Sequence, residues 1–295
     1  MKYKTIYIYL ILGFISTLLF SCASKINLTH KTSLKNPELQ LLWVTDTILS
    51  DIESVIYDKK NDIIYTSSIN GNWLKKGGIG FISKLDLSGN ITTHKWINNL
   101  EGPTGLTIFN DKLYVADFEN VVEIDIDKSK ITNTTFVEGT KRINDLTVTN
   151  DGAIYGTGTL QGKLFSIENK KVSILKNDLA RPNGILVQGD NLLLGLSGLK
   201  SVNTYNLKTK SMETLTKGII NPDGITAIGN GDYLVSSWQG TIHYVYKNGD
   251  KKLLLDTSKK GINAADIHYI PSKNILLVPA MLKHKLMAYK LIDNN

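Results

Sequence analysis

Six residues whose side chains could bind a common ligand recur along the chain at nearly regular spacing. Each stands where a turn leads into an apolar run, and the six are Glu53, Thr104, Asn144, Asn183, Asp223 and Asp266. Five of the six carry a carboxylate or an amide. Oxygen atoms of these groups are the ligands that hard divalent cations such as Ca²⁺ and Mg²⁺ require. The pattern therefore predicts a cation site, provided that the fold brings these positions together.

Turn formation is the competing explanation for individual members of this set. Asn183 and Asp223 lie in the similar Pro/Gly turns 181–184 and 221–224. In such turns an Asn or Asp side chain often bonds the local backbone. Glu53 is not a turn former, and the combination of Glu53 with Asn183 and Asp223 therefore favours a metal site.

The spacing predicts the elements that must position these residues. The steps between the six are 51, 40, 39, 40 and 43 residues, and a second apolar run follows each of them. A period near 40 residues built of short strands is typical of the blades of a β-propeller. Equivalent turns of a propeller converge on its axis, because the innermost strand of each blade lines the central channel. We therefore expect an all-β, six-bladed propeller with the six residues around its axis.

The two ends of the chain predict how the ring closes. The sixth repeat contains only three strand-like runs, at 267–270, 275–278 and 286–291. A fourth run, at 39–48, precedes the first repeat. If this N-terminal strand joins the last blade, it completes that blade and removes the free edges of the ring. The expected propeller domain is 39–295.

The first residues have the pattern of an export signal. Lys2 and Lys4 precede an apolar run over 6–20, which is followed by Cys22, the only cysteine of the chain. This arrangement predicts a signal peptide over 1–21. An uncleaved membrane anchor is the alternative, although the apolar run is short for a membrane span.

Residues 19–22, Leu-Phe-Ser-Cys, resemble a bacterial lipobox. This resemblance implies that Cys22 is acylated and becomes the new N-terminus. Residues 22–38 would then form a tether, and the protein would be anchored by lipid to the bacterial cell envelope. We expect the anchor to face the periplasm, since the tether lacks an acidic run of the sort that might mark surface export.

Composition argues against several other functions. The formal net charge is +7, but acidic residues are interspersed with the lysines, so we expect a solvated basic surface and no nucleic-acid partner. The single cysteine lies in the lipobox, which excludes a thiol nucleophile and a disulfide in the mature chain. The five histidines show no paired spacing of the kind that zinc sites use, and there is no Gly-x-Ser-x-Gly motif.

Four motifs together resemble the senescence marker protein/gluconolactonase family, also called regucalcin-like. They are 53–55 (Glu-Ser-Val), 142–145 (Arg-Ile-Asn-Asp), 181–184 (Arg-Pro-Asn-Gly) and 221–224 (Asn-Pro-Asp-Gly). Members of this family are six-bladed propellers with one divalent cation on the axis. The resemblance covers nearly the whole mature chain and implies a hydrolase of small, sugar-derived lactones.

The resemblance also implies a role for each matched residue. Glu53, Asn183 and Asp223 would bind the cation, with calcium expected and magnesium or zinc as alternatives. Arg142 and Asn144 would hold the substrate. The cation would polarise the lactone carbonyl, and Asp223 would be the base that activates the attacking water. For Arg142, an ordinary surface cation is the alternative.

The sequence departs from the family in places that bear on the substrate. Val55 and Tyr57 stand where the family usually has proline and tryptophan. A glycine-rich insertion at 70–80 carries Trp73 and is either a lid over the site or a surface loop. Asp266 adds an acidic group without an assigned role.

Two other functions fit the same pattern. One is a non-catalytic propeller that binds a ligand or protein at the channel mouth and contains a structural metal. The other is an ester or organophosphate hydrolase on the same scaffold. A purely structural metal would not need Arg142 and Asn144, so this pair favours an enzyme.

Overall fold

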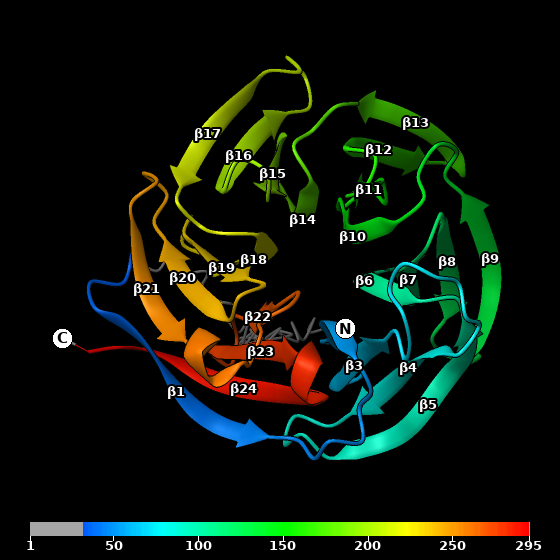
Figure 1. Cartoon of the computed structure of the whole chain (residues 1–295), viewed down its shortest axis with the longest axis horizontal. Helices are drawn as coiled ribbons and strands as arrows, with labels where there is room; N and C mark the ends of the chain where they lie inside the picture. Colours follow the sequence, from blue (N-terminus) through cyan, green and yellow to red (C-terminus); the bar gives the residue numbers. More distant parts are fainter. Residues whose placement is uncertain (1–31, 295) are drawn as a thin grey trace, which may run out of the picture. The chain divides into compact units, whose positions relative to one another are not determined.

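The computed structural model describes residues 32–294, which contain six four-stranded antiparallel sheets. The sheets are arranged around a central axis as the blades of a β-propeller (Figure 1), which confirms the predicted fold class. No helix in this part of the chain is long and apolar enough to cross a membrane. The predicted signal peptide, Cys22 and the first ten residues of the predicted tether, 22–31, lie outside the described residues.

Blades 1 to 5 follow one another along the chain, and the first strand of each lies nearest the axis (Figure 1). Blade 1 consists of β2 (Ile52–Asp58), β3 (Ile63–Ser68), β4 (Gly80–Leu85) and β5 (Ile91–Leu100). Blade 2 consists of β6 (Pro103–Phe109), β7 (Lys112–Asp117), β8 (Asn120–Asp125) and β9 (Lys130–Phe136). Blade 3 consists of β10 (Ile143–Val148), β11 (Ile154–Gly158), β12 (Lys163–Glu168) and β13 (Lys171–Lys176).

The remaining blades have the same organisation. Blade 4 consists of β14 (Pro182–Gln188), β15 (Asn191–Leu196), β16 (Ser201–Asn206) and β17 (Met212–Lys217). Blade 5 consists of β18 (Pro222–Ala227), β19 (Tyr233–Ser237), β20 (Thr241–Val245) and β21 (Lys251–Asp256). Blade 6 contains β22 (His268–Ile270), β23 (Ile275–Ala280) and β24 (Lys285–Asp293), and two 3-10 turns, η1 (Ser258–Lys260) and η2 (Met281–Lys283), flank β22 and β23.

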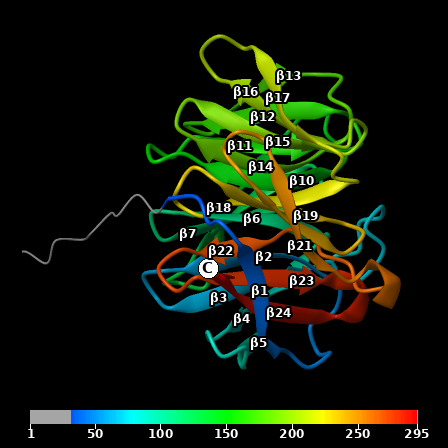
Figure 2. The ribbon, with the colours of Figure 1, turned by 90° about the vertical axis from the view of Figure 1, so that its left-hand side faces the viewer.

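The N-terminal strand closes the ring, as the strand count predicts. The strand β1 (Pro37–Val44) pairs antiparallel with β24 and forms the outer edge of blade 6 (Figure 2). The register places Leu39 opposite Leu291. Just before β1, the backbone N–H of Asn36 donates to Asp293 Oδ1 at 2.7 Å. The start of the described chain is therefore held against its end.

The hydrophobic core lies between neighbouring blades. The second strands β11 and β19 are buried along their whole length, because both faces of a middle strand pack against the adjacent sheets. One apolar cluster joins Tyr65 and Ile82 of blade 1 to Val115 and Val122 of blade 2. The outer strand β9 is instead mostly exposed.

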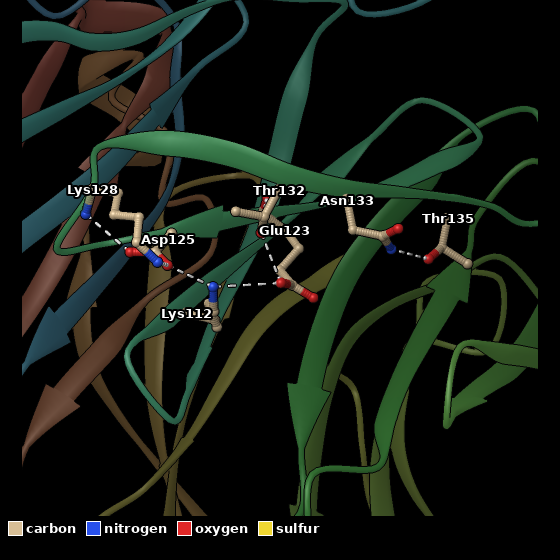
Figure 3. Close-up of polar contacts among 7 residues, drawn as sticks. All are labelled: Lys112, Glu123, Asp125, Lys128, Thr132, Asn133 and Thr135. Atoms are coloured by element: carbon tan, nitrogen blue, oxygen red, sulfur yellow. Dashed lines mark hydrogen bonds and ion pairs between the residues drawn. The ribbon is translucent and has the colours of Figure 1, made fainter.

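Ionic contacts at the outer part of blade 2 illustrate the surface of the propeller (Figure 3). Lys112 Nζ lies 2.8 Å from Asp125 Oδ2 and 3.7 Å from Glu123 Oε1, while Lys128 Nζ lies 3.1 Å from the same Asp125 oxygen. These lysines lower the pKa of Asp125. On this blade the basic residues are thus balanced by acidic neighbours.

The insertion at 70–80 connects β3 to β4 and lies against blade 2. The backbone N–H of Gly77 donates to the carbonyl oxygen of Glu101, and that of Gly78 to Glu101 Oε2, both at 3.2 Å. Lys76 forms an ion pair with Glu119. These contacts hold the insertion near the axial end of blade 2, where its tryptophan can reach the central cavity.

Candidate metal and substrate site

The six predicted axial positions lie at the start of the innermost strands or just before them. For Glu53, Thr104, Asn144, Asn183 and Asp223, the pairing of the first and second strands of the blade shifts register at that residue. Such a bulge turns a side chain away from its regular alternation in the strand. Asp266 differs, because β22 begins only at His268.

The five axial residues other than Asp266 line one cavity of about 400 Å³ on the axis. Arg142 lines the same cavity, whereas Asp266 does not. The structure therefore brings together all five residues that the sequence assigns to the metal and the substrate. These are Glu53, Asn183 and Asp223 for the metal, and Arg142 and Asn144 for the substrate.

Four oxygen atoms of the cavity are buried and have no hydrogen-bond partner among the described residues. They are Glu53 Oε2, Asn144 Oδ1, Asn183 Oδ1 and Asp223 Oδ1. A buried polar atom without a partner is unfavourable by about 1–3 kcal/mol, so these four oxygens are suited to binding a ligand. Carboxylate and amide oxygens are the donors that calcium and magnesium prefer, and the set therefore fits a divalent cation.

The donor set is poor in the ligands that softer metals select. In the described part of the chain, no group of three or more His, Cys, Asp or Glu side chains is placed to hold a metal. The candidate site instead combines the two carboxylates of Glu53 and Asp223 with amide oxygens. Such a set suits calcium or magnesium better than zinc, which is usually bound by thiolate and imidazole.

The three predicted metal ligands share a backbone conformation that the other axial positions lack. The residue two positions before each of them has a left-handed φ, of 42°, 52° and 44° respectively, for Asp51, Arg181 and Asn221. Residues other than glycine adopt this conformation at a cost of roughly 1–2 kcal/mol. Local strain of this kind is concentrated at functional sites, where the surrounding structure enforces it.

Glycines allow the innermost strands to approach closely beside the site. A Cβ atom added to Gly184 would clash with the backbone carbonyl oxygen of Asp223. An added Cβ at Gly224 would clash with the backbone nitrogen of Ile267. Glycine therefore follows Asn183 and Asp223 because the strands β14 and β18 meet the next blade backbone to backbone.

Acidic side chains are concentrated in the cavity and beside it. Burial raises the pKa of Glu53 well above its usual value, and repulsion from Asp223, Asp266 and Asp145 adds to this effect. Burial and repulsion from Asp266 likewise raise the pKa of Asp223. Arg142 is the group that opposes the shift of Glu53. A divalent cation among these oxygens would supply the positive charge that a buried acidic cluster needs.

Two of the four buried carboxylates hold neighbouring blades together. Asp266 Oδ2 accepts a hydrogen bond from Ser54 Oγ at 2.5 Å, and burial raises the pKa of Asp266 to about 7. Asp145 accepts from the backbone N–H groups of Leu146 at 2.7 Å and Ile185 at 2.9 Å. The structure thus gives Asp266 a contact between blades 6 and 1. No role for Asp145 was predicted from the sequence, although this residue lies in the motif 142–145.

Arg142 is only 1% exposed, so it is not a surface cation. One guanidinium nitrogen, Nη1, donates to the carbonyl oxygen of Gly102 at 2.7 Å. The guanidinium carbon lies 4.5 Å from the centre of the Phe118 ring and 5.9 Å from that of Trp73. Nε and Nη2 have no hydrogen-bond partner within residues 32–294. Arg142 is therefore held in place while two of its nitrogens remain available to a ligand.

A second ring of side chains surrounds the mouth of the cavity. Because the strands are antiparallel, each second strand ends beside the start of the first. The residues directly after the second strands are Ile69, Phe118, Thr159, Ser197, Trp238 and Met281. All but Phe118 line the cavity, and Phe118 packs on Arg142. The sequence analysis missed this ring, although the position after each second apolar run would have located it.

Known proteins resemble this chain in fold but not detectably in sequence. No protein-family model and no curated protein matches this chain. Among solved structures, the calcium-binding protein regucalcin from Agrobacterium tumefaciens is similar, with a TM-score of 0.67 and 18% identity over 85% of this chain and 94% of that chain. This likeness shows the fold.

Two lyases are also similar in structure. One is a catalytically inactive histidine-to-alanine variant of virginiamycin B lyase from Staphylococcus aureus with quinupristin. It has a TM-score of 0.62 and 15% identity over 87% of this chain and 100% of that chain. The other is a streptogramin B lyase, with a TM-score of 0.61 and 15% identity over 87% of this chain and 97% of that chain. At these identities the similarity extends to the propeller and not to the activity.

Proposed function

We propose that this protein is a divalent-cation-dependent hydrolase of small lactones, similar in activity to gluconolactonases. The observation that carries the proposal is the meeting of two kinds of unsatisfied group in one cavity. Buried oxygens of Glu53, Asn144, Asn183 and Asp223 lie there together with two free nitrogens of Arg142. The first set suits a cation and the second suits a carbonyl or carboxylate oxygen.

In this proposal Glu53, Asn183 and Asp223 hold the cation, which is calcium. When bound, the cation polarises the substrate carbonyl and lowers the pKa of water. Arg142 donates to an oxygen of the lactone, while the cavity walls exclude bulk water. Asn144 is fixed by the hydrogen bond from its Nδ2 to Thr159 Oγ1 at 3.0 Å, which leaves its oxygen directed to a ligand.

Asp223 is the proposed general base. It is 2% exposed, and its Oδ1 has no hydrogen-bond partner among the described residues, so it can accept the proton of the attacking water. The water oxygen bonds to the carbonyl carbon, the ring C–O bond breaks, and the ring oxygen takes up a proton. The product is a hydroxy acid, whose new carboxylate can be bound by Arg142.

The chemistry of the lyase neighbour is not proposed for this chain. The inactive variant of virginiamycin B lyase has a histidine replaced by alanine. No histidine lines the axial cavity formed by residues 32–294. A purely structural metal would leave the free nitrogens of Arg142 without a role. A propeller that only binds a ligand there would use them, and the absence of turnover would distinguish it from the hydrolase.

Lactone hydrolysis by the chain without residues 1–21 tests this proposal. We expect turnover of at least one lactone in a panel of aldonolactones and alkyl lactones, lost on addition of a chelator and restored by calcium. An Asp223→Asn variant should lose turnover, whereas Asp190→Asn, at an exposed position outside the cavity, should retain it. Calcium binding without turnover of any lactone would instead support the binding propeller.

We also infer that the chain is exported and anchored through a lipid on Cys22, facing the periplasm. The support for this is the sequence of residues 1–22, in which a basic start and an apolar run are followed by the lipobox-like residues 19–22. Metabolic labelling with a radioactive fatty acid should mark the wild type and not a Cys22→Ser variant. If other proteins of the cell envelope are labelled but the wild-type protein is not, the inference is contradicted.

A further inference from the structure

The cavity has an apolar wall on one side. Ile69, Trp238 and Met281 come from blades 1, 5 and 6, which are consecutive around the ring, and they pack together in one cluster with Ala265. Leu282 extends this wall toward the mouth and is 56% exposed. No ligand is needed to satisfy these side chains, but an apolar group placed against them would be removed from water.

The opposite side of the cavity carries most of its polar and basic side chains, with Trp73 beside Arg142. Blade 3 contributes Arg142, Asn144 and Thr159, and blade 4 contributes Arg181 and Ser197. Of the candidate metal ligands, Glu53 and Asp223 come from blades 1 and 5, and Asn183 comes from blade 4. A ligand that satisfies the whole cavity therefore has an oxygen-rich end and an apolar end.

We infer that the site prefers lactones whose ring carries an alkyl or aromatic substituent over polyhydroxylated sugar lactones. This inference rests on the proposed hydrolase function and specifies its substrate class. The lactone carbonyl would lie between the metal ligands and Arg142, and the substituent would lie against Trp238 and Met281. The ring hydroxyls of a sugar lactone would instead face this apolar wall and lose their hydrogen bonds to water.

The expected preference follows from the contact with this wall. Each methylene group that is fully buried strengthens binding by about fourfold. The wall has an open edge at Leu282, so a chain of several carbons is only partly covered. We therefore expect about a tenfold preference for a hexyl-substituted lactone over a hydroxylated lactone with the same five-membered ring.

The test compares kcat/KM for these two lactones with the chain without residues 1–21, in the presence of calcium. Leu282→Ser should lower kcat/KM for the hexyl lactone by about threefold to tenfold through KM, and leave the hydroxylated lactone within about twofold. Because Leu282 is exposed, this variant should fold normally. Trp238→Ala should have a larger effect of the same kind, and Trp238→Phe should retain most of the preference. Leu253→Ala, an exposed apolar position outside the cavity, is the control.

The outcomes separate this inference from the function on which it rests. Higher kcat/KM for the hexyl lactone, reduced selectively by Leu282→Ser, supports it. Calcium-dependent turnover that favours the hydroxylated lactone overturns the inference and leaves the proposed hydrolase intact. If neither lactone is hydrolysed, the hydrolase proposal fails, and the substrate class proposed here fails with it.

Discussion

Ser54 and Asp266 are joined by a hydrogen bond at the junction where the first and last blades meet, with Ser54 Oγ 2.5 Å from Asp266 Oδ2. The backbone N–H of Asp266 also donates to the carbonyl oxygen of Glu53 at 3.0 Å. The contact between the two blades therefore includes the backbone of a candidate metal ligand. Closure of the ring and placement of Glu53 depend on the same few atoms.

Replacing Ser54 by alanine should weaken this junction. The variant leaves a buried carboxyl group without its hydrogen-bond donor, so we expect the free energy of unfolding to fall by about 1–3 kcal/mol. Urea denaturation measures this, with Ser88→Ala at an exposed position as the control. A Ser54→Ala variant as stable as the wild type would show that the Asp266 carboxyl finds another donor.

Calcium should stabilise the propeller in proportion to the logarithm of its concentration, once that concentration exceeds the dissociation constant. Asp223→Asn removes one of the two carboxylates in the donor set and should weaken calcium binding by about 100-fold. The same change should stabilise the metal-free protein, because it removes a buried negative charge near Glu53 and Asp266. Melting curves with calcium and with chelator test both effects. A metal-free Asp223→Asn variant that melts below the wild type would contradict the electrostatic argument.

Arg142→Lys should affect the substrate more than the metal. Lysine keeps the positive charge near Glu53 but loses the free guanidinium nitrogens, so kcat/KM should fall by about 10- to 100-fold. Calcium affinity, measured by titration calorimetry, should stay within about twofold of the wild type. A loss of calcium affinity with unchanged kcat/KM would place Arg142 in support of the metal.

Gly184→Ala should disrupt the site and the fold together. The added methyl group clashes with the carbonyl oxygen of Asp223, so the strands β14 and β18 must separate. We expect a loss of about 3 kcal/mol in the free energy of unfolding and weaker calcium binding. Gly189→Ala is the matched control, because an added Cβ there meets nothing within 4 Å, and it should lose only about 1 kcal/mol. Equal effects of the two changes would refute the close approach of the strands.

His243 should contribute stability that is lost as the pH falls below about 6.5, whereas the raised pKa values of the buried carboxyl groups act in the opposite direction. Burial, with a further contribution from Lys251, lowers the pKa of His243 to about 4. Between that value and about 6.5 the unfolded chain binds the proton and the folded chain does not, so stability is lost as the pH falls through this range. His243→Gln should remove about 1–2 kcal/mol of this loss, after discounting for partial solvent screening.

Urea denaturation at pH 7.5 and at pH 5 measures the effect of His243. The difference between wild type and variant isolates this residue from the buried carboxylates, whose contributions are common to both proteins. His268, whose pKa burial also lowers to about 4, should still contribute in the variant. An identical pH dependence in the two proteins would show that the pKa of His243 is the same in the folded and unfolded states.

The number of blades and the way they close could be predicted from the sequence, because each blade repeats the same spacing of apolar runs. The convergence of Glu53, Asn183 and Asp223 followed from the same repeat. The role of Asp145 could not be predicted, since its hydrogen bond to Ile185 joins two blades and leaves no local pattern. The apolar wall was also missed, because Trp238 owes its position to the antiparallel register and its neighbours in the ring differ in type.

The pairing of β1 with β24 also determines when the ring can close during synthesis. The first strand has no partner in the described structure until the last strand has been made, because nearly the whole chain lies between them. A nascent chain that begins at the N-terminus therefore carries an unpaired edge throughout its synthesis. Any premature stop before residue 285 removes the partner of β1 and leaves the circle open. The ring can therefore close only in chains that have been synthesised through β24.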